Sequence, residues 1–200
     1  MIFSDCSSQS PYFALWKNRC IFSDMTDIMT RDQRHRNMAS IHSASTTPEL
    51  ILRHALWNKG FRYRINDKRL PGKPDIVLPK YRTAIFIHGC FWHGHKGCKN
   101  YTIPKTNTEF WTAKINRNQE RDQGVWRQLE AKGWNVIIVW ECELERARLA
   151  DTLIRVIREL QHNLEAYLSL KSDRKHNRLA YLEERKRKQL TVRLRKPTKT

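Results

Sequence analysis

The sequence predicts an α/β domain in which helices cover a central sheet, and two observations lead to that prediction. Residues 83–89 and 135–140 are almost wholly apolar, as expected of strands that are buried on both faces. Segments with helical spacing precede the first of these strands and separate the two. A chain of 200 residues is long enough for one such domain with additional extensions.

The first part of the domain is expected to contain a helix and a strand. The helix begins at Thr47, before a proline that suits the first helical turn, and ends near Gly60. Residues 61–66 then alternate in polarity as a half-buried strand does. This pattern places three side chains on one face: Phe61, Tyr63 and Ile65.

The rest of the domain is expected to be two short strands, a long helix and a last strand. A turn over residues 67–74 leads to strands at 75–78 and 83–89. Residues 108–133 have the length of a long helix and end on Gly133, a typical helix stop. The strand at 135–140 follows immediately.

Both ends of the chain have a different character from this central part. Residues 1–24 show little periodicity and are interpreted as a mobile leader or a mis-assigned start, while 31–43 form a short basic helix or arm. The domain itself is placed at 25–145, and 146–200 are a helical and basic C-terminal extension. Residues 143–170 keep helical spacing, whereas 173–200 hold eleven Lys or Arg against three Asp or Glu. Such a charge run is usually solvated and poorly ordered, with phosphate binding as the alternative.

Charge and cysteine content narrow the class of protein. A net charge of +18 and a pI near 10.1 indicate a polyanionic partner, nucleic acid first and an anionic membrane second. No apolar run approaches the length of a membrane span, and no export signal is recognised. Five cysteines without such a signal argue against a disulfide framework and favour metal ligation or simple burial.

One short segment concentrates the candidate chemistry. Cys90, His95 and Cys98 offer three zinc-type ligands on a tight loop, and Cys142, at the end of the last strand, is placed to be the fourth. Four filled positions would make the ion structural, although Cys142 could instead be a buried thiol. His88 and His93 remain outside this set, and two histidines beside an acidic metal site favour catalysis.

Five stretches, "PGKPD", "IFIHGCFWH", "TNTEFW", "NQERD" and "GWNVIIVWEC", resemble the very short patch repair endonucleases over about residues 29–145. The resemblance implies a restriction-endonuclease-like fold, a three-layer α/β/α arrangement with a central mixed sheet and a structural zinc site. It also implies a Mg²⁺-dependent enzyme that nicks DNA on the 5′ side of the thymine in a T:G mispair, a product of 5-methylcytosine deamination.

The resemblance also assigns roles in catalysis. Asp75 is similar to the family's Mg²⁺ carboxylate, with the main-chain carbonyl of Ile87 as second ligand, where some relatives have threonine. Gly89 stands where restriction enzymes carry a lysine. His93 is similar to the general base that activates water and His88 to a residue near the scissile phosphate, and a near-neutral pKa suits such proton transfer.

Two acidic residues match family positions but have a structural alternative. Glu49 matches an active-site position, and it equally fits a capping box with Thr46 at the start of the first helix. Asp122 matches a further position, but a solvated helix charge is the interpretation we favour from the sequence.

The remaining assignments concern DNA. By resemblance, Phe91, Trp92 and Trp111 enter the base stack from the major groove and Met38 wedges the minor groove, with core packing as the alternative for the rings. Lys114 and Asn118 share a helix face and resemble residues used at the mispair, although solvent-facing side chains would look the same. The expected phosphate contacts come from the basic arm: Arg31, Arg34 and Arg36.

The expected partner is therefore double-stranded DNA carrying a T:G mismatch, and no membrane partner is expected. The protein is expected to be a monomer in the bacterial cytoplasm, associated with the nucleoid. Mismatch-repair proteins such as MutL and a repair polymerase are further partners implied by the resemblance. Two alternatives stay open: a non-catalytic zinc-stabilised DNA-binding protein, and a restriction-type endonuclease that cuts both strands of unmodified DNA. The presence of Asp75 and His93 favours the nicking enzyme over the first.

Overall fold

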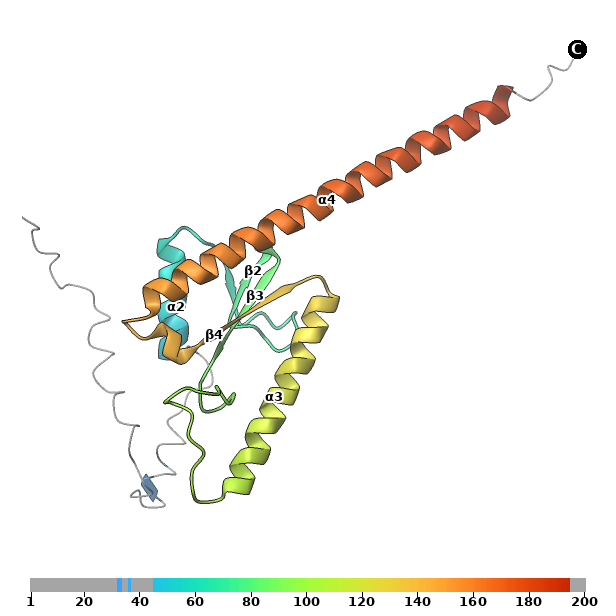
Figure 1. Ribbon diagram of the computed structural model, residues 1–200. Coiled ribbons are helices and arrows are strands. Elements are labelled where there is room, and N and C mark those ends of the chain that lie inside the picture. Colours follow the sequence, from blue (N-terminus) through green and yellow to red (C-terminus); the bar gives the residue numbers. More distant parts are fainter. Residues whose placement is uncertain (1–31, 34–35, 37–44, 195–200) are drawn as a thin grey trace, which may run out of the picture.

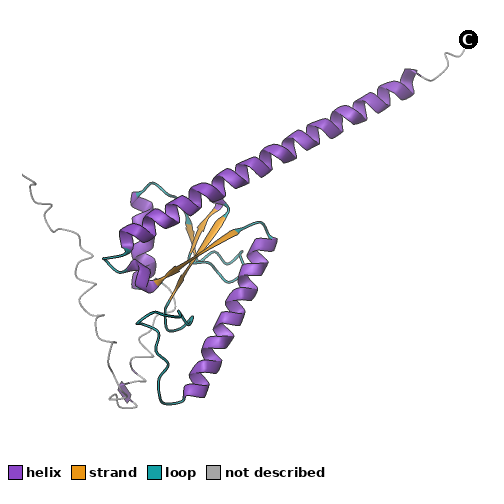
Figure 2. Ribbon diagram, viewed as in Figure 1, coloured by secondary structure: helices purple, strands orange, loops and turns teal. Residues whose placement is uncertain are grey.

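The computed structural model describes residues 32–33, 36 and 45–194, with side chains as far as Arg185. Its principal elements, in chain order, are α2 (Thr47–Asn58), β1 (Arg64–Ile65), β2 (Ile76–Leu78), η2 (Pro79–Tyr81), β3 (Thr83–His88), α3 (Thr108–Ala131), β4 (Asn135–Trp140), η3 (Glu141–Leu144) and α4 (Leu149–Leu194). Figure 1 shows helices on both sides of the sheet, and Figure 2 shows the loop-rich connection between β3 and α3.

The strands form one mixed sheet in the order β1-β2-β3-β4. The pairs β1–β2 and β2–β3 are antiparallel, whereas β3 and β4 are parallel. In the parallel pair Ile85 lies opposite Ile137 and His88 opposite Trp140, so both strands end at the same edge. The mixed α/β class expected from the sequence is thereby confirmed.

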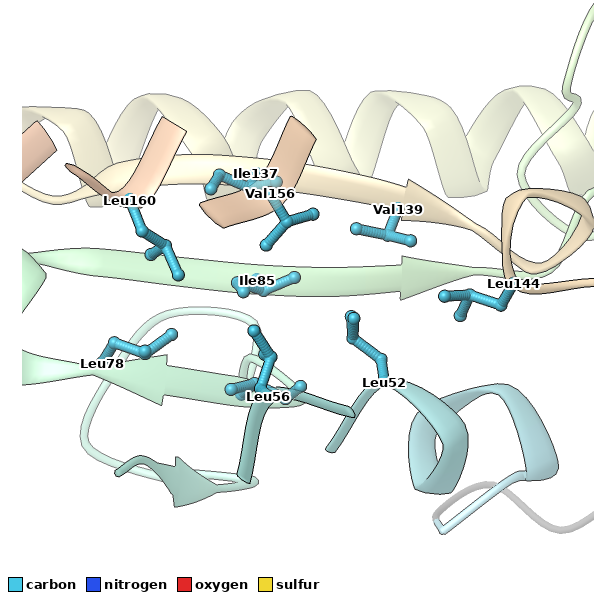
Figure 3. Packing of buried hydrophobic residues seen from close by; sticks show 10 residues of the cluster. Leu52, Leu56, Leu78, Ile85, Ile137, Val139, Leu144, Val156 and Leu160 are labelled. Atoms are coloured by element: carbon cyan, nitrogen blue, oxygen red, sulfur yellow. The ribbon is translucent and has the colours of Figure 1, made fainter. Parts of the chain in front are cut away.

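Helices cover both faces of this sheet, which explains why β3 and β4 are apolar throughout. On one face Ile85 and Val139 pack with leucines of α2 and α4, as Figure 3 shows. On the other face Phe86 and Ile138 pack against α3 around Leu129. Alternate residues of one strand point to opposite faces of the sheet, so a strand that is covered on both faces needs a continuous apolar run.

Two boundaries differ from the prediction. The strand expected over residues 61–66 is paired only at Arg64–Ile65, and Ile65 is 53% exposed, because only Phe61 and Tyr63 of that set reach the core. The helix after β4, α4, begins at Leu149, after the short 3-10 helix η3, rather than at residue 143.

The C-terminal helix is also longer than predicted. Residues 173–194, expected to be poorly ordered, continue α4 instead. Between Leu149 and Leu194 the sequence has no glycine or proline, and Lys, Arg, Glu and Leu are good helix formers. No helix among the described residues is both long and apolar enough to cross a bilayer.

Candidate active site and metal cluster

The parallel pairing of β3 and β4 brings the two candidate metal-binding segments together. β3 ends at His88 and continues into the loop that holds Cys90, while β4 ends at Trp140, directly before Cys142. The backbone N–H of Cys90 donates a hydrogen bond to the Glu141 carboxylate over 3.1 Å, which ties the loop to the end of β4. Cys142 is therefore a neighbour of the loop in space, although it lies about 50 residues further along the chain.

The four predicted soft ligands form one cluster. The ligand atoms of Cys90, His95, Cys98 and Cys142 all lie within 4.8 Å of one another. His95 Nδ1 faces two sulfurs, at 3.4 Å from Cys90 Sγ and 3.5 Å from Cys142 Sγ. A tetrahedral zinc ion with ordinary bond lengths separates a sulfur and a nitrogen ligand by about 3.5 Å, so the donors fit that ion in type and spacing.

The surroundings of this cluster support metal binding. The His95 ring stacks on Trp140 at 4.1 Å with an interplanar angle of 3°, which holds the imidazole in one orientation. Burial raises the pKa of the Cys90 and Cys142 thiols above the usual value. Because a metal binds thiolates, a bound cation would supply the charge that keeps both sulfurs deprotonated.

Asp75 lies at the start of β2 and faces the end of β3. Its Oδ2 accepts a hydrogen bond of 2.8 Å from the Ile87 backbone N–H. The pKa of Asp75 is raised to about 6, chiefly by desolvation and also by the nearby Glu49 carboxylate, against the opposing effect of the Ile87 hydrogen bond. Asp75 and Ile87 are thus adjacent, as the magnesium prediction requires.

The buried ion pair between Glu49 and Arg53 holds the backbone of Asp75. Glu49 is only 5% exposed, and its Oε2 accepts a hydrogen bond of 2.8 Å from Arg53. The same guanidinium nitrogen donates to the backbone carbonyl of Asp75 over 3.2 Å. Arg53 therefore links α2 to the start of β2, a role that the sequence did not reveal.

The capping box predicted for Glu49 forms only in altered form. Its carboxylate accepts hydrogen bonds from the Thr46 hydroxyl over 2.9 Å and from the Ser45 backbone N–H over 3.0 Å. Thr46 makes no side-chain cap bond in return. Glu49 thus tethers the residues before α2 while pairing with Arg53, because its burial requires several donors.

The two histidines outside the Cys/His cluster, His88 and His93, stack on each other next to the end of β3. The rings of His88 and His93 are stacked, with centroids 3.7 Å apart and an interplanar angle of 16°. His88, the last residue of β3, is buried, and its ring contacts the rings of Trp126 and Trp140. The pKa of His88 is lowered to about 3, chiefly by desolvation and also by the neighbouring His93, so this imidazole is neutral near pH 7.

His93 is held by an acid from α3. Its Nδ1 lies 2.5 Å from Asp122 Oδ2, and Arg121 donates to the other carboxylate oxygen over 3.2 Å. Burial alone would raise the pKa of Asp122, but the hydrogen bond and charge of His93 outweigh it and hold that pKa below its usual value. The ligand atoms of His88, His93 and Asp122 also lie within 4.8 Å of one another.

Asp122 corrects one expectation from the sequence. We favoured a solvated helix charge there, whereas the residue is only 8% exposed and faces His93. The available signal was the helix period: Asp122 follows Ile115 by seven residues and precedes Leu129 by seven, and both are core residues. An acid on the buried stripe of a helix needs a partner, which here is an imidazole.

Aromatic side chains of the same loop pack against the first turn of α3. Phe91 packs edge-on against Trp92 and Trp111 at 5.1 and 5.3 Å between ring centroids. All three are half-buried, so they neither join the core nor stand free in solvent. Asn118 donates a hydrogen bond of 2.9 Å to the Trp92 carbonyl and thereby fixes the loop on α3.

Gly94 allows this close approach of loop and helix. Its φ is +66°, a left-handed conformation that favours glycine, and an added Cβ would lie 2.4 Å from Gln119 Nε2. Gln119 in turn donates to the His93 carbonyl over 3.0 Å. The backbone on both sides of His93 is therefore held by α3.

The other residues predicted to contact DNA lie only partly within the described residues. Lys114 is exposed on α3, whereas Asn118 is half-buried and used by the loop. Arg36 is exposed, and its Nε donates to the Asp32 carbonyl. Three predicted contact residues, Arg31, Arg34 and Met38, lie outside the described residues.

Comparison with known proteins matches residues 26–100 to the family described as DNA mismatch endonuclease Vsr. The type II nicking enzyme V.NmeAIP of Neisseria meningitidis serogroup A is 53% identical over 138 residues, which cover 68% of this chain and 98% of that protein. The type II nicking enzyme V.XorIIP of Xanthomonas oryzae is 42% identical over 66% of this chain and 97% of its own. DNA mismatch endonuclease Vsr of Escherichia coli K12 is 44% identical over 64% of this chain and 81% of its own.

Proposed function

The chain belongs to the Vsr family of DNA mismatch endonucleases and is a DNA-nicking endonuclease of that family, and we propose that it nicks one strand on the 5′ side of the thymine in a T:G mispair. Such a mispair arises when 5-methylcytosine is deaminated, and the nick would start very short patch repair. The observation that carries the proposal is that His93 shares one loop with Phe91 and Trp92, whose rings pack with Trp111 of α3.

His93 is proposed as the general base. Its Nδ1 is engaged with Asp122, so Nε2 is the nitrogen that would take a proton from the attacking water. The Asp122 carboxylate keeps the Nδ1–H tautomer in place and stabilises the imidazolium that forms after proton transfer. His88, stacked on His93 and neutral, would offer an uncharged N–H to the scissile phosphate.

Asp75 and the main-chain carbonyl of Ile87 are proposed to hold Mg²⁺. The two residues are joined by the 2.8 Å hydrogen bond, and a partly desolvated carboxylate with a raised pKa is an environment in which a divalent cation relieves the cost of the negative charge. When bound, the ion would stabilise charge on the phosphate and on the leaving oxygen. The charge of His93 lowers the pKa of Asp75, so the proposed base acts on the proposed metal carboxylate electrostatically.

A structural Zn²⁺ is proposed at the Cys90, His95, Cys98 and Cys142 cluster. Four protein ligands leave no position for water, so this ion would stabilise the loop rather than react. Because His93 lies between two of the ligands in sequence, the ion would also fix the position of the base.

The ring cluster is proposed to open the duplex at the mispair. Unstacking a base step costs a few kcal/mol and less at a mispair, so insertion of these rings would favour damaged sites. Met38 would enter the minor groove, Lys114 and Asn118 would lie near the mispair, and the arginines at 31, 34 and 36 would bind phosphates.

We further propose a restriction-endonuclease-like fold with its catalytic domain at residues 25–145. The first half of α4 adds Val156 and Leu160 to the core, so that domain would need these turns in order to fold.

The experiment is a nicking assay on duplexes labelled on each strand in turn. The expected result with Mg²⁺ is one cut, 5′ to the thymine of a T:G duplex, and no cut in the matched homoduplex or with Asp75→Ala. Equal cutting of homoduplex would refute mismatch specificity, and cutting of both strands would favour the restriction-type alternative. Because two relatives are named type II nicking enzymes, the flanking bases should be varied to test for a preferred sequence context.

A further inference from the structure

The outer part of α4 is a helix whose side chains are exposed. From Leu168 to Arg185 every residue is exposed, and Figure 1 shows this half of the helix projecting away from the sheet. We define residues 168–185 as the distal arm. At a rise of about 1.5 Å per residue the arm is roughly 26 Å long, too long to be an overhanging last turn.

Basic side chains follow one face of the distal arm. Counted from the first, they stand 3, 4, 7 and 14 residues further along, the spacing of neighbours on one face of a helix. At about 100° per residue they fall within an arc of roughly 100°. The members of this basic stripe are Lys171, Arg174, Lys175, Arg178 and Arg185, and all five are exposed.

The acidic residues of the arm lie elsewhere on the helix. Asp173, Glu183 and Glu184 fall roughly 120° to 220° around the axis from the first lysine of the stripe. Positive and negative charges are therefore separated on this helix. On an ordinary solvated face they would be interspersed. The arrangement presents a row of cations to one side.

The arm leaves the domain at the end of the sheet away from the candidate active site. Asn163 donates to the Thr83 hydroxyl over 3.1 Å, and Arg82 lies over the Tyr167 ring at 6.0 Å. Both contacts are at the start of β3, whereas His88 is at its other end, about 17 Å along the strand. The arm therefore extends the molecule in the direction opposite to the catalytic loop.

We propose that the basic stripe is a second DNA-binding surface, which binds the phosphates of a duplex segment other than the one held at the catalytic end. The inference rests on the family's DNA-nicking activity and does not require the T:G substrate. The stripe spans about 21 Å, over which a duplex presents roughly 12 phosphate charges. Lys and Arg alone bind backbone without sequence information, so this surface would add affinity and not specificity.

The same residues fit an anionic bilayer less well. An interfacial helix inserts a continuous apolar face below its charged face. Residues 171–178 contain no apolar side chain at all, so half of the stripe has nothing to insert. The stripe therefore fits DNA phosphates, which it can bind through its charges alone, better than it fits a bilayer.

The test compares salt dependence of binding to homoduplex DNA in full-length proteins. The variant changes the stripe to glutamine at all five positions (Lys171→Gln, Arg174→Gln, Lys175→Gln, Arg178→Gln and Arg185→Gln), and the control exchanges Lys for Arg and Arg for Lys at the same positions. Since each phosphate contact contributes about 0.9 to the slope of log K against log salt, the glutamine variant should lose about 3 to 5 from that slope. Its affinity near physiological salt should fall about 10- to 100-fold, while the exchanged control should keep both values.

Three results would overturn the proposal. The slope of the glutamine variant could equal that of the wild type, or the charge-preserving control could lose as much as the glutamine variant. The loss could also be the same on a duplex of about 12 base pairs, roughly 40 Å long, as on a much longer one, since a short duplex cannot occupy both surfaces. Loss of binding to phosphatidylserine vesicles with an unchanged DNA slope would assign the arm to membranes instead. Far-ultraviolet circular dichroism checks that the helix is intact, and the mismatch-nicking assay reports on the proposed function separately.

Discussion

Replacing Asp75 by asparagine should stabilise the metal-free protein while abolishing nicking. In the folded protein the pKa of Asp75 is raised from 3.8 to about 6, a difference of roughly two pKa units. At about 1.36 kcal/mol per unit, ionising this carboxyl at neutral pH destabilises the fold by at most about 3 kcal/mol. Asparagine has the same shape, carries no charge and keeps an oxygen to accept the Ile87 N–H.

The pH dependence of this effect has a definite sign. Between about pH 4 and 6 the folded protein keeps the Asp75 proton that the unfolded chain releases, so stability falls as pH rises through that window. Below about pH 4 both states are protonated, and the wild type and Asp75→Asn should be equally stable. Above about pH 6 the variant should be more stable by about 2 to 3 kcal/mol.

Urea unfolding of Mg²⁺-free protein at a series of pH values, with zinc retained, measures this difference. Added Mg²⁺ at about 100 times its dissociation constant should stabilise the wild type by about 2.7 kcal/mol and leave the variant unchanged. Asp151→Asn, at an exposed acid in the first turn of α4, is the matched control and should cost at most about 0.5 kcal/mol. A variant that is less stable than the wild type at pH 7.5, or a difference that ignores pH, would refute the reasoning.

Three further predictions concern the Cys/His cluster, the histidine site and the buried ion pair. Cys98→Ala should lose bound zinc and show a lower Tm, whereas Cys98→His should retain the ion; a metal analysis with full zinc in the alanine variant would contradict a structural cluster. His93→Ala should slow single-turnover nicking about 100- to 10,000-fold and Asp122→Asn at least about tenfold, with DNA affinity unchanged; equal rates for Asp122→Asn would show that the hydrogen bond does not orient the base. Arg53→Met should destabilise the fold by about 3 kcal/mol in urea because it leaves the buried Glu49 carboxylate without its cation, and Glu49→Gln in the same chain should restore most of that loss; a stable single variant would argue against the ion pair.

Local patterns were sufficient for most of the secondary structure. The apolar run at β4 and the glycine stop after α3 were placed within a residue or two, because periodicity and turn chemistry are properties of neighbouring residues. Where a boundary depended on distant partners the prediction was wrong: Ile65 follows the alternation of a strand but finds no core to cover it. Helix propensity, in turn, carried α4 through a charge run in which we expected disorder.

The sequence by itself determined the charge, the strands and helices, the soft ligands and the family resemblance, because each depends on residue types and on their spacing along the chain. The sequence also placed Cys142 as a fourth ligand beside His95, and the parallel pairing of β3 with β4 brings the two together. Other partners were decided only by the tertiary structure. Asp122 meets His93 across 29 residues because α3 packs against the sheet, and Arg53 meets the Asp75 carbonyl across 22. Chain spacing cannot encode such contacts, because they depend on which strand edges and helix faces coincide once the core has formed.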